Sequence, residues 1–487
     1  MPENAAPAAH RRTGIVGTGT LYNLMARAAF LAGGYGLHIG LARILGPASY
    51  GIIGVVLPLA TIARVLVMDG PRQAISKLTA EQEGGAAAIR RAALVIEGLF
   101  SGLVLVAMVA GAGLLAGILR DPSLALYIRL VAPMVPATAL LSVYLASLNG
   151  LHAFGRQALV SVIYGLGRAV LGVVGAWLWG LPGALLGLVV LPFLALGLAH
   201  LLLPATRSEG RFPARKLIAF SVPMVVFAVG DALLMYLDLL FVKGLVRDGA
   251  QVGYYAAAGT VAQVPYYVLL ALADTLLPVT ARLLGQGQRE QARRTIAQGL
   301  RYGLMLLLPA GALIAATGEP LMALVYGGDF SSAGAVLAVL IWAQTFYAFA
   351  SVLTSVLIAE DRHLQAMALA LALLPVSVVL NLLLVPRLGL LGAACSTAAA
   401  TLVGMVVSFW LVRRHFGPLV ELRSVGAIAA AAVLSGALAF WWRPQGLLLL
   451  PAYAALWGLD LLLLWLLGEV RPADLWRLAR LVGRAAA

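Results

Sequence analysis

Long apolar stretches, separated by short polar segments, follow one another along almost the whole chain. A helix needs about 20 apolar residues to cross a bilayer, so this pattern predicts an all-α polytopic membrane protein. The composition agrees, because 62% of the 487 residues are hydrophobic and only 11% are charged. A soluble protein carries about a quarter charged residues, and no soluble fold of this length could bury so much apolar surface.

The apolar stretches predict a transmembrane helical bundle of about fourteen helices. The predicted spans are 15–42, 49–69, 93–119, 124–148, 157–179, 183–203, 217–243, 252–282, 296–318, 333–358, 364–385, 389–412, 425–442 and 447–468. A missed helical hairpin would change this number without changing the sides on which the termini lie.

The basic residues predict an orientation. Most of the 34 Lys and Arg residues fall in the terminal segments and in every second connection, whereas the opposite face holds Arg43, Arg120, Arg129, Lys243, Arg247, Arg387 and Arg443. Because Lys and Arg collect in cytoplasmic segments, both termini of this multi-pass membrane protein are predicted to be cytoplasmic. The net charge of +14 then reflects topology, and we expect no nucleic-acid partner.

Several site types are not expected. A single cysteine, Cys395, excludes intramolecular disulfides and cysteine-rich metal sites. None of the three lysines follows a glycine, so the chain has no phosphate-binding loop of the ATPase type. We expect no cofactor and no catalytic residues. The tail from Arg471 to Arg484 interleaves basic and apolar residues, which predicts an interfacial amphipathic helix; a solvated tail is the alternative.

Two pairs of segments suggest an internal repeat. Gly180 is followed by Leu-Pro-Gly-Ala and Gly389 by Leu-Leu-Gly-Ala, and both join one span to the next. Tyr50-Gly51 and Gly253-Tyr254 likewise open two spans in different halves. Many secondary transporters are built from repeated halves with the substrate between them, although chance similarity in apolar sequence is the alternative.

Polar side chains form narrow stripes on four predicted spans. On a helix with 100° per residue, the members of each stripe share one face. The stripes are Thr20, Asn23, Arg27, Gly34 and His38 in the first span; Thr61, Arg64 and Met68 in the second; Asp231 and Asp238 in the seventh; and Thr260, Gln263, Tyr267, Asp274 and Pro278 in the eighth. Ionisable groups within spans usually face a cavity or a partner, so the stripes predict a water-filled cavity lined by these spans.

Each of these groups also has a structural alternative. Arg301 could extend to the cytoplasmic face, and Asp238 could pair with Lys243 near the end of its helix. Arg168 could pair with an acidic residue for packing alone. His38 is expected to be a hydrogen-bonded core residue, and for Asp274 a structural role is as reasonable as an ion site.

Four stretches resemble the polysaccharide-transporter branch of the multidrug/oligosaccharidyl-lipid/polysaccharide exporter (MOP) superfamily, of the O-antigen flippase type. They are LARILGPASYG (41–51) with MDGP (68–71), VGYYAAAGTVAQ (252–263) with LLPVTARLL (276–284), YGGDFSSAGAVLAVL (326–340) and VVLNLLLVPRLGLLGAA (378–394). Each is degenerate alone, but together they follow the family's order and spacing over most of the chain.

The resemblance implies a flippase for oligosaccharide linked to a polyprenyl pyrophosphate of the undecaprenyl type, acting in surface polysaccharide biosynthesis by alternating access. It implies a lobe at 1–210, a second lobe at 211–415, each of six helices, and two peripheral helices with the tail at 416–487. Membrane lipids and a polysaccharide polymerase are the expected partners. Transport would take place in the bacterial inner membrane and would depend on an ion gradient or the membrane potential rather than on ATP.

Residue chemistry suggests roles for the polar groups. Arginine suits bidentate phosphate binding, so Arg27 and Arg64 are the first candidates for the pyrophosphate, followed by Arg168, with Asn23 and Gln263 as further cavity candidates. The candidate ion-coupling residues are Asp231, Asp238 and Asp274.

Three other functions are alternatives to the oligosaccharide flippase. A multidrug/cation antiporter of the same superfamily should have a mainly acidic cavity, and a lipid II flippase fits the four stretches less well. A membrane glycosyltransferase or polymerase would need sizeable outer loops, whereas the predicted outer loops are short except near 244–251 and 319–332.

Overall fold

The computed structural model describes residues 6–81, 85–204, 212–246 and 248–469, and every regular element in these ranges is helical. The chain divides into two compact units, Met1–Gly253 and Tyr254–Ala487. The boundary between the two units falls inside the helix Gly249–Ala262, labelled α7. The predicted lobe boundaries after residues 210 and 415 stay predictions, and the predicted tail helix at 471–484 lies outside the described residues.

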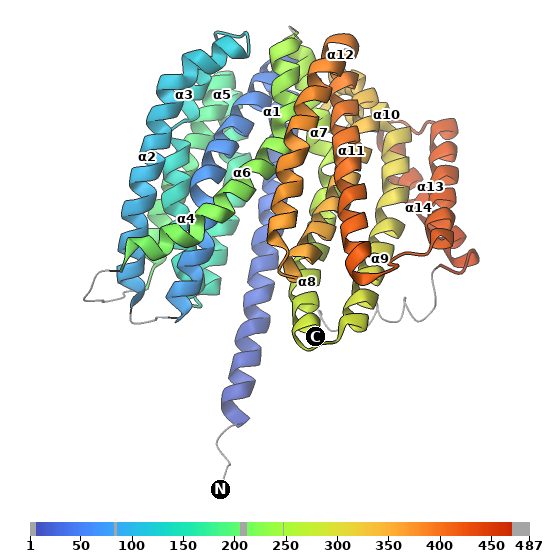
Figure 1. Ribbon diagram of the computed structural model, residues 1–487. Helices are drawn as coiled ribbons and strands as arrows, with labels where there is room; N and C mark the ends of the chain where they lie inside the picture. The colour runs from blue at the N-terminus through green and yellow to red at the C-terminus, as the bar shows by residue number, and fades with distance from the viewer. Residues whose placement is uncertain (1–5, 82–84, 205–211, 247, 470–487) are drawn as a thin grey trace. The chain divides into compact units, whose positions relative to one another are not determined.

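The first unit contains the helices drawn from blue to green in Figure 1. They are α1 (Ala6–Glu81), α2 (Ala86–Ile118), α3 (Leu124–Val131), α4 (Met134–Gly150), α5 (Phe154–Leu202) and α6 (Ala214–Leu245). Within this unit α1 contacts each of the other five helices.

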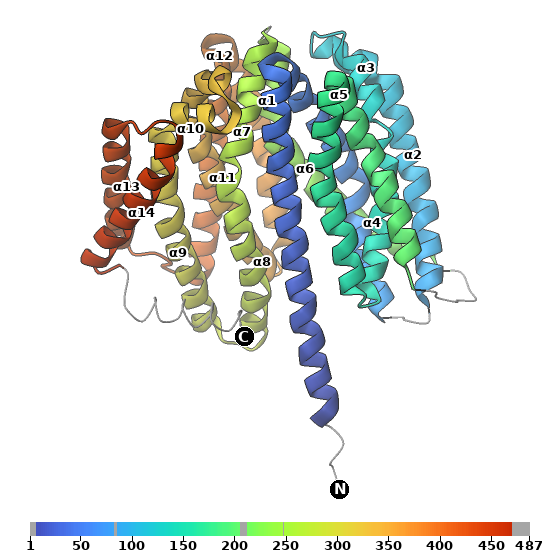
Figure 2. The same ribbon diagram turned by 180° about the vertical axis from the view of Figure 1, so that it is seen from behind.

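The second unit begins inside α7 (Gly249–Ala262) and runs to the red end of the chain (Figure 2). Its further helices are α8 (Val264–Gly285), α9 (Arg289–Ala316), α10 (Gly318–Tyr326), η2 (Gly328–Ala333), α11 (Gly334–Ala359), α12 (His363–Phe416), α13 (Leu422–Trp442), η3 (Gly446–Leu448) and α14 (Leu449–Leu466). Here α11 packs against α8, α9 and α12, and the α13–α14 pair packs on α9.

Ten helical segments are long and apolar enough to cross a membrane, counting described residues only. Three of these segments, in α1, α5 and α12, measure 47, 49 and 54 residues. A span needs about 20 residues, so each is long enough for two crossings. Each contains one glycine with positive φ and non-helical angles: Gly46, Gly180 and Gly389. With α6, whose side chains are described only in part, these divisions give the predicted bundle of about fourteen spans.

Gly180 and Gly389 turn the chain back on itself in the same way. A Cβ on Gly175 would lie 2.7 Å from the carbonyl carbon of Gly183, and a Cβ on Gly392 would lie 2.5 Å from that of Leu384. In both cases the residue five before the turning glycine contacts the residue three after it. The two halves of each helix therefore form an antiparallel hairpin without a loop, and this part of the predicted repeat has a common local structure.

The other pair in the predicted repeat packs backbone to backbone. A Cβ on Gly51 would lie 2.5 Å from the carbonyl oxygen of Gly249 and 2.9 Å from the nitrogen of Gly253. Side chains at Gly51 and Gly253 would therefore separate the start of the second half of α1 from α7. Small residues permit such close helix contacts in lipid, where apolar burial gives no driving force.

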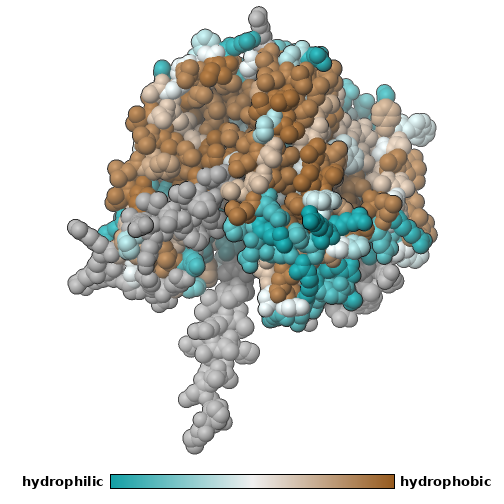
Figure 3. All heavy atoms as spheres, in the orientation of Figure 1, coloured by the Kyte–Doolittle hydropathy of each residue, from teal (hydrophilic) through white to brown (hydrophobic). Residues whose placement is uncertain are grey.

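The surface is apolar where lipid would contact it. Figure 3 shows hydrophobic residues over most of the visible face. Large apolar side chains such as Trp177, Leu201 and Leu103 are 75%, 81% and 64% exposed, whereas many of the buried residues are alanines. Large residues outside and small residues inside are typical of helices that pack in a membrane.

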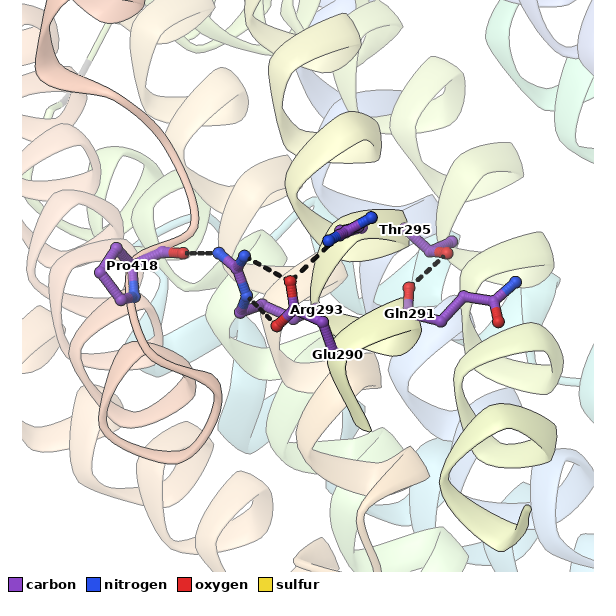
Figure 4. A network of polar contacts seen from close by, with 6 residues as sticks. Glu290, Gln291, Arg293, Thr295 and Pro418 are labelled. Atoms are coloured by element: carbon purple, nitrogen blue, oxygen red, sulfur yellow. Dashed lines mark hydrogen bonds and ion pairs between the residues drawn. The ribbon is translucent and has the colours of Figure 1, made fainter. Parts of the chain in front are cut away.

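Polar contacts join the ends of helices at positions that the charge pattern assigned to one face. Arg289 donates to Glu360 at 2.7 Å and to the His415 carbonyl at 2.7 Å, and Arg293 donates to the Pro418 carbonyl at 2.7 Å. Glu290 accepts from Arg293 in the same network (Figure 4). Three connections predicted to be cytoplasmic thus meet at one end of the second unit, while the side of the membrane stays a prediction.

The glycine contacts predict a position-dependent effect of valine. Gly175→Val and Gly392→Val should each lower stability by about 1–3 kcal/mol, because the new side chain meets backbone that cannot rotate away. The melting temperature of the purified protein in detergent measures this. Gly113→Val is the matched control, since a Cβ at this mid-helix glycine meets nothing within 4 Å. Equal melting temperatures for all three variants would contradict the loop-free hairpins.

Candidate functional site

The first half of α1 packs in parallel against the first half of α5. A Cβ on Gly165 would lie 2.9 Å from the Phe30 Cα, and one on Gly40 would lie 2.5 Å from a Val173 methyl. Between these two contacts lies Arg168, whose Nη2 donates to the Phe30 carbonyl at 2.8 Å. The guanidinium carbon lies 3.8 Å from the centre of the Phe30 ring.

Arg168 therefore has a clear structural function. A Cβ on Gly34 would lie 3.2 Å from Arg168 Nη2, so the small residue leaves room for the guanidinium beside the helix backbone. A charge-assisted hydrogen bond and a cation–π contact together fix α5 on α1. These contacts, to a backbone carbonyl and an aromatic ring, agree with the packing alternative for Arg168.

The other polar residues of the first stripe lie on the same half of α1. Asn23 and Arg27 are exposed, and they lie two turns and one turn before Phe30, respectively. Farther along, the Nδ1 of His38 lies 2.9 Å from the hydroxyl of the buried Tyr50. The expectation that His38 is a hydrogen-bonded core residue is confirmed.

Arg64 and the α6 aspartates belong to the same unit. Arg64 is half-buried on the second half of α1, and Asp231 is half-buried on α6. Asp238, 6% exposed, accepts a hydrogen bond from the backbone N–H of Leu239 at 2.7 Å. Since α1 packs against α6, the unit contains three of the four predicted stripes.

The fourth stripe lies in the second unit. The hydroxyl of Tyr267 donates to Gln263 Oε1 at 3.3 Å, at the junction of α7 and α8. The side chain of Asp274 lies outside the described residues. A cavity shared by all four stripes would involve both units and stays a prediction.

Lys243 has a partner that the spacing did not indicate. Its Nζ lies 2.6 Å from Asp121 Oδ2, in the turn between α2 and α3. Partial burial opposes ionisation of Asp121, but hydrogen bonds from Lys243 and Ser123 outweigh it and hold the pKa of Asp121 below its usual value. This pair joins α6 to α2 and α3, at two connections that the charge pattern placed on the outer face.

Arg301 also bonds to a carboxylate. Its Nε donates to Glu469 Oε2 at 3.1 Å, and its Nη2 donates to the Glu469 carbonyl. Glu469 accepts a further bond from Ser424 at 2.8 Å. Because Glu469 follows α14 and Ser424 lies on α13, Arg301 ties this helical pair to α9.

Comparisons with known proteins agree with this fold. The model of a family described as polysaccharide biosynthesis protein matches residues 40–335. The chain belongs to this family. The match includes both halves of the α5 hairpin, the α7–α8 junction and the first two residues of α11.

The curated relatives of the chain include two from Haloferax volcanii. The probable low-salt glycan biosynthesis flippase Agl15 is 28% identical over 40% of this chain and 41% of its own length. The probable flippase AglR is 24% identical over 42% of each. The aligned region thus spans less than half of these relatives.

Solved structures show the same fold at low identity. The lipid II flippase MurJ, in an inward closed conformation, has a TM-score of 0.74 over 94% of this chain and 99% of its own, at 14% identity. An inward-facing MATE multidrug transporter of the MOP superfamily has a TM-score of 0.60 at 15% identity, over 82% of this chain and 95% of its own. The predicted fold class, an all-α transmembrane bundle, is therefore confirmed.

Two buried carboxylates lie outside the predicted stripes. Glu97 on α2 is 1% exposed and Asp460 on α14 is 1% exposed. Glu97 Oε2 and both carboxylate oxygens of Asp460 are buried and accept no hydrogen bond from the described part of the chain. Both are single acids in apolar spans, and that signal was present in the sequence. Intramembrane acids of this kind are candidates for carrying protons.

The Asp121–Lys243 pair predicts a pH-dependent coupling. Asp121→Asn and Lys243→Met should each lower stability by about 1–3 kcal/mol at neutral pH. Because the folded pKa of Asp121 is lowered, the pair contributes fully above the ordinary carboxyl pKa of about 4 and is lost as the pH falls through the folded pKa. A double-mutant cycle on melting temperatures at pH 7 and at lower pH measures the coupling. Zero coupling at pH 7 would show that the pair does not stabilise the fold.

Proposed function

We propose that the protein is a flippase that moves oligosaccharide linked to a polyprenyl pyrophosphate across the cytoplasmic membrane, for the biosynthesis of a surface polysaccharide. The family match over residues 40–335 carries the proposal. The names of the Haloferax relatives and the MurJ-like fold support it. A carrier of the undecaprenyl type, a polymerase partner and cytoplasmic termini belong to the proposal.

The physical task explains the polar groups. A glycan headgroup cannot cross hydrocarbon without polar contacts, and a pyrophosphate requires cations. We assign Arg27 and Arg64 to the pyrophosphate, with Asn23 and Gln263 as further contacts. Arg168 contributes indirectly, because its contacts to Phe30 hold α1, which carries Arg27, against α5.

Energy for transport comes from an ion gradient in this proposal. Asp231, Asp238 and Asp274 are the proposed coupling residues. Glu97 joins them because its carboxylate is buried and its Oε2 has no hydrogen-bond partner among the described residues. The protein acts as a transporter by alternating access and not as an enzyme. A MATE-like fold also suits drug export, and the stripes hold three aspartates beside two arginines, so the phenotype of the deletion strain must separate the two functions.

Deletion of the gene provides the test of the function. We expect glycan linked to polyprenyl pyrophosphate to accumulate facing the cytoplasm, because the lipid is still made but no longer moved. Extraction of the lipid, together with its accessibility to a membrane-impermeant label, measures the amount and the side. Normal surface polysaccharide in a strain without a redundant transporter would overturn the proposal, and drug hypersensitivity without glycolipid accumulation would favour the antiporter.

Arginine substitutions separate binding from packing. Arg27→Ala and Arg64→Ala should reduce transport at least about tenfold with unchanged membrane abundance, since a lost contact to phosphate costs about 1.5–3 kcal/mol. Arg168→Ala should lower abundance as well, because it loses the contacts to Phe30. Full transport by both Arg27→Ala and Arg64→Ala would remove the assigned role of these arginines.

A further inference from the structure

The junction of α7 and α8 is a break in a membrane segment. α7 ends at Ala262 and α8 begins at Val264, with Pro265 at the start of the new helix. Proline has no N–H to donate to the carbonyl four residues earlier, so the hydrogen-bond ladder is interrupted here. In transporters such interruptions are found where the segment faces substrate or ions.

Three tyrosine rings lie directly after this break. The ring centres of Tyr266 and Tyr347 are 5.2 Å apart with an interplanar angle of 34°, and those of Tyr266 and Tyr267 are 5.4 Å apart. All three side chains are half-buried, so part of each remains accessible. Tyr347 lies on α11, and the cluster therefore joins α8 to α11 within the second unit.

Two glutamines precede the tyrosines by one helical turn. Leu269 and Phe349 pack against the same glycine, Gly303, so α8 and α11 run in parallel beyond the pair Tyr266 and Tyr347. Three residues before this pair, Gln263 and Gln344 occupy equivalent positions on the two helices. Gln263 accepts from the Tyr267 hydroxyl at 3.3 Å.

Gln344 is the unusual member. Its side chain is 7% exposed, and its Oε1 is buried without a hydrogen-bond donor among the described residues. A buried acceptor that lacks a donor costs about 1–3 kcal/mol. Such a group beside accessible rings points to a ligand that brings its own hydroxyl donor.

We propose that Gln263, Tyr266, Tyr267, Gln344 and Tyr347 form a binding site for a neutral sugar ring of the transported glycolipid; this inference rests on the proposed function. The negative face of an aromatic ring attracts the C–H groups of a sugar, and amides both donate to and accept from hydroxyls. None of the five side chains is charged, so the site suits the saccharide rather than the pyrophosphate. The sugar and the phosphate are thus recognised by different chemistry.

Binding to protein reconstituted in lipid nanodiscs tests the proposal. The two probes are the glycolipid that accumulates in the deletion strain and the same polyprenyl pyrophosphate without its glycan, both radiolabelled. Tyr347→Leu and Gln344→Leu should weaken glycolipid binding about tenfold each and leave binding of the glycan-free lipid unchanged, since a ring contact or a hydrogen bond is lost. Tyr347→Phe should retain most of the affinity, because it keeps the ring.

The controls lie on α9 of the same unit. Tyr302→Leu and Gln298→Leu remove the same residue types at an exposed tyrosine and an exposed glutamine, and should bind both lipids as the wild type does. Gln344→Leu nearly preserves side-chain volume and keeps the test valid if Tyr347→Leu does not fold.

The outcomes separate the two proposals. Wild-type affinity for the glycolipid in folded Gln344→Leu and Tyr347→Leu proteins would overturn the sugar site while the flippase proposal stands. Equal weakening for both lipids would also overturn it, because the site would not then recognise sugar. Failure of the wild type to bind either lipid would overturn both proposals.

Discussion

Inside a bilayer, a peptide N–H or carbonyl has no water to bond with, and each unpaired group costs several kcal/mol. Helices satisfy these groups within one segment, and every described regular element of this chain is a helix. The same constraint determines where a helix may be interrupted. The turn at Gly180 interrupts the helix for two residues and the turn at Gly389 for one. The break before Pro265 is followed by a cluster of polar and aromatic side chains.

Hydropathy and charge were enough to predict the class and the approximate number of crossings, because both depend on properties of single segments. They did not predict that successive spans would be joined by a tight turn at one glycine without a loop, as in α5 and α12. That arrangement depends on one glycine with positive φ and on close contact between the two halves. The repeated Gly-Leu-x-Gly sequence was visible, but its hairpin geometry required three-dimensional structure.

The candidate site was predicted less completely. Helical phase placed the polar residues on common faces but could not supply partners from other helices. Arg168 donates to the backbone carbonyl of Phe30. Every residue has such a carbonyl, so no residue type in the sequence could have indicated this contact. Lys243 pairs with Asp121 across more than a hundred residues, whereas spacing favoured the nearby Asp238. The unfilled acceptor of Gln344 was likewise invisible, since burial and the absence of a donor are properties of packing.

The loop-free turn at Gly180 also limits how the chain can enter the membrane. Its two helices are joined without a polar connection, so no segment there could be held in water while one helix waits for the other. The two helices within residues 154–202 are therefore expected to enter the membrane together, as one helical hairpin. At the turn itself, this pair offers a protease, a modifying enzyme or an antibody no loop of extended chain.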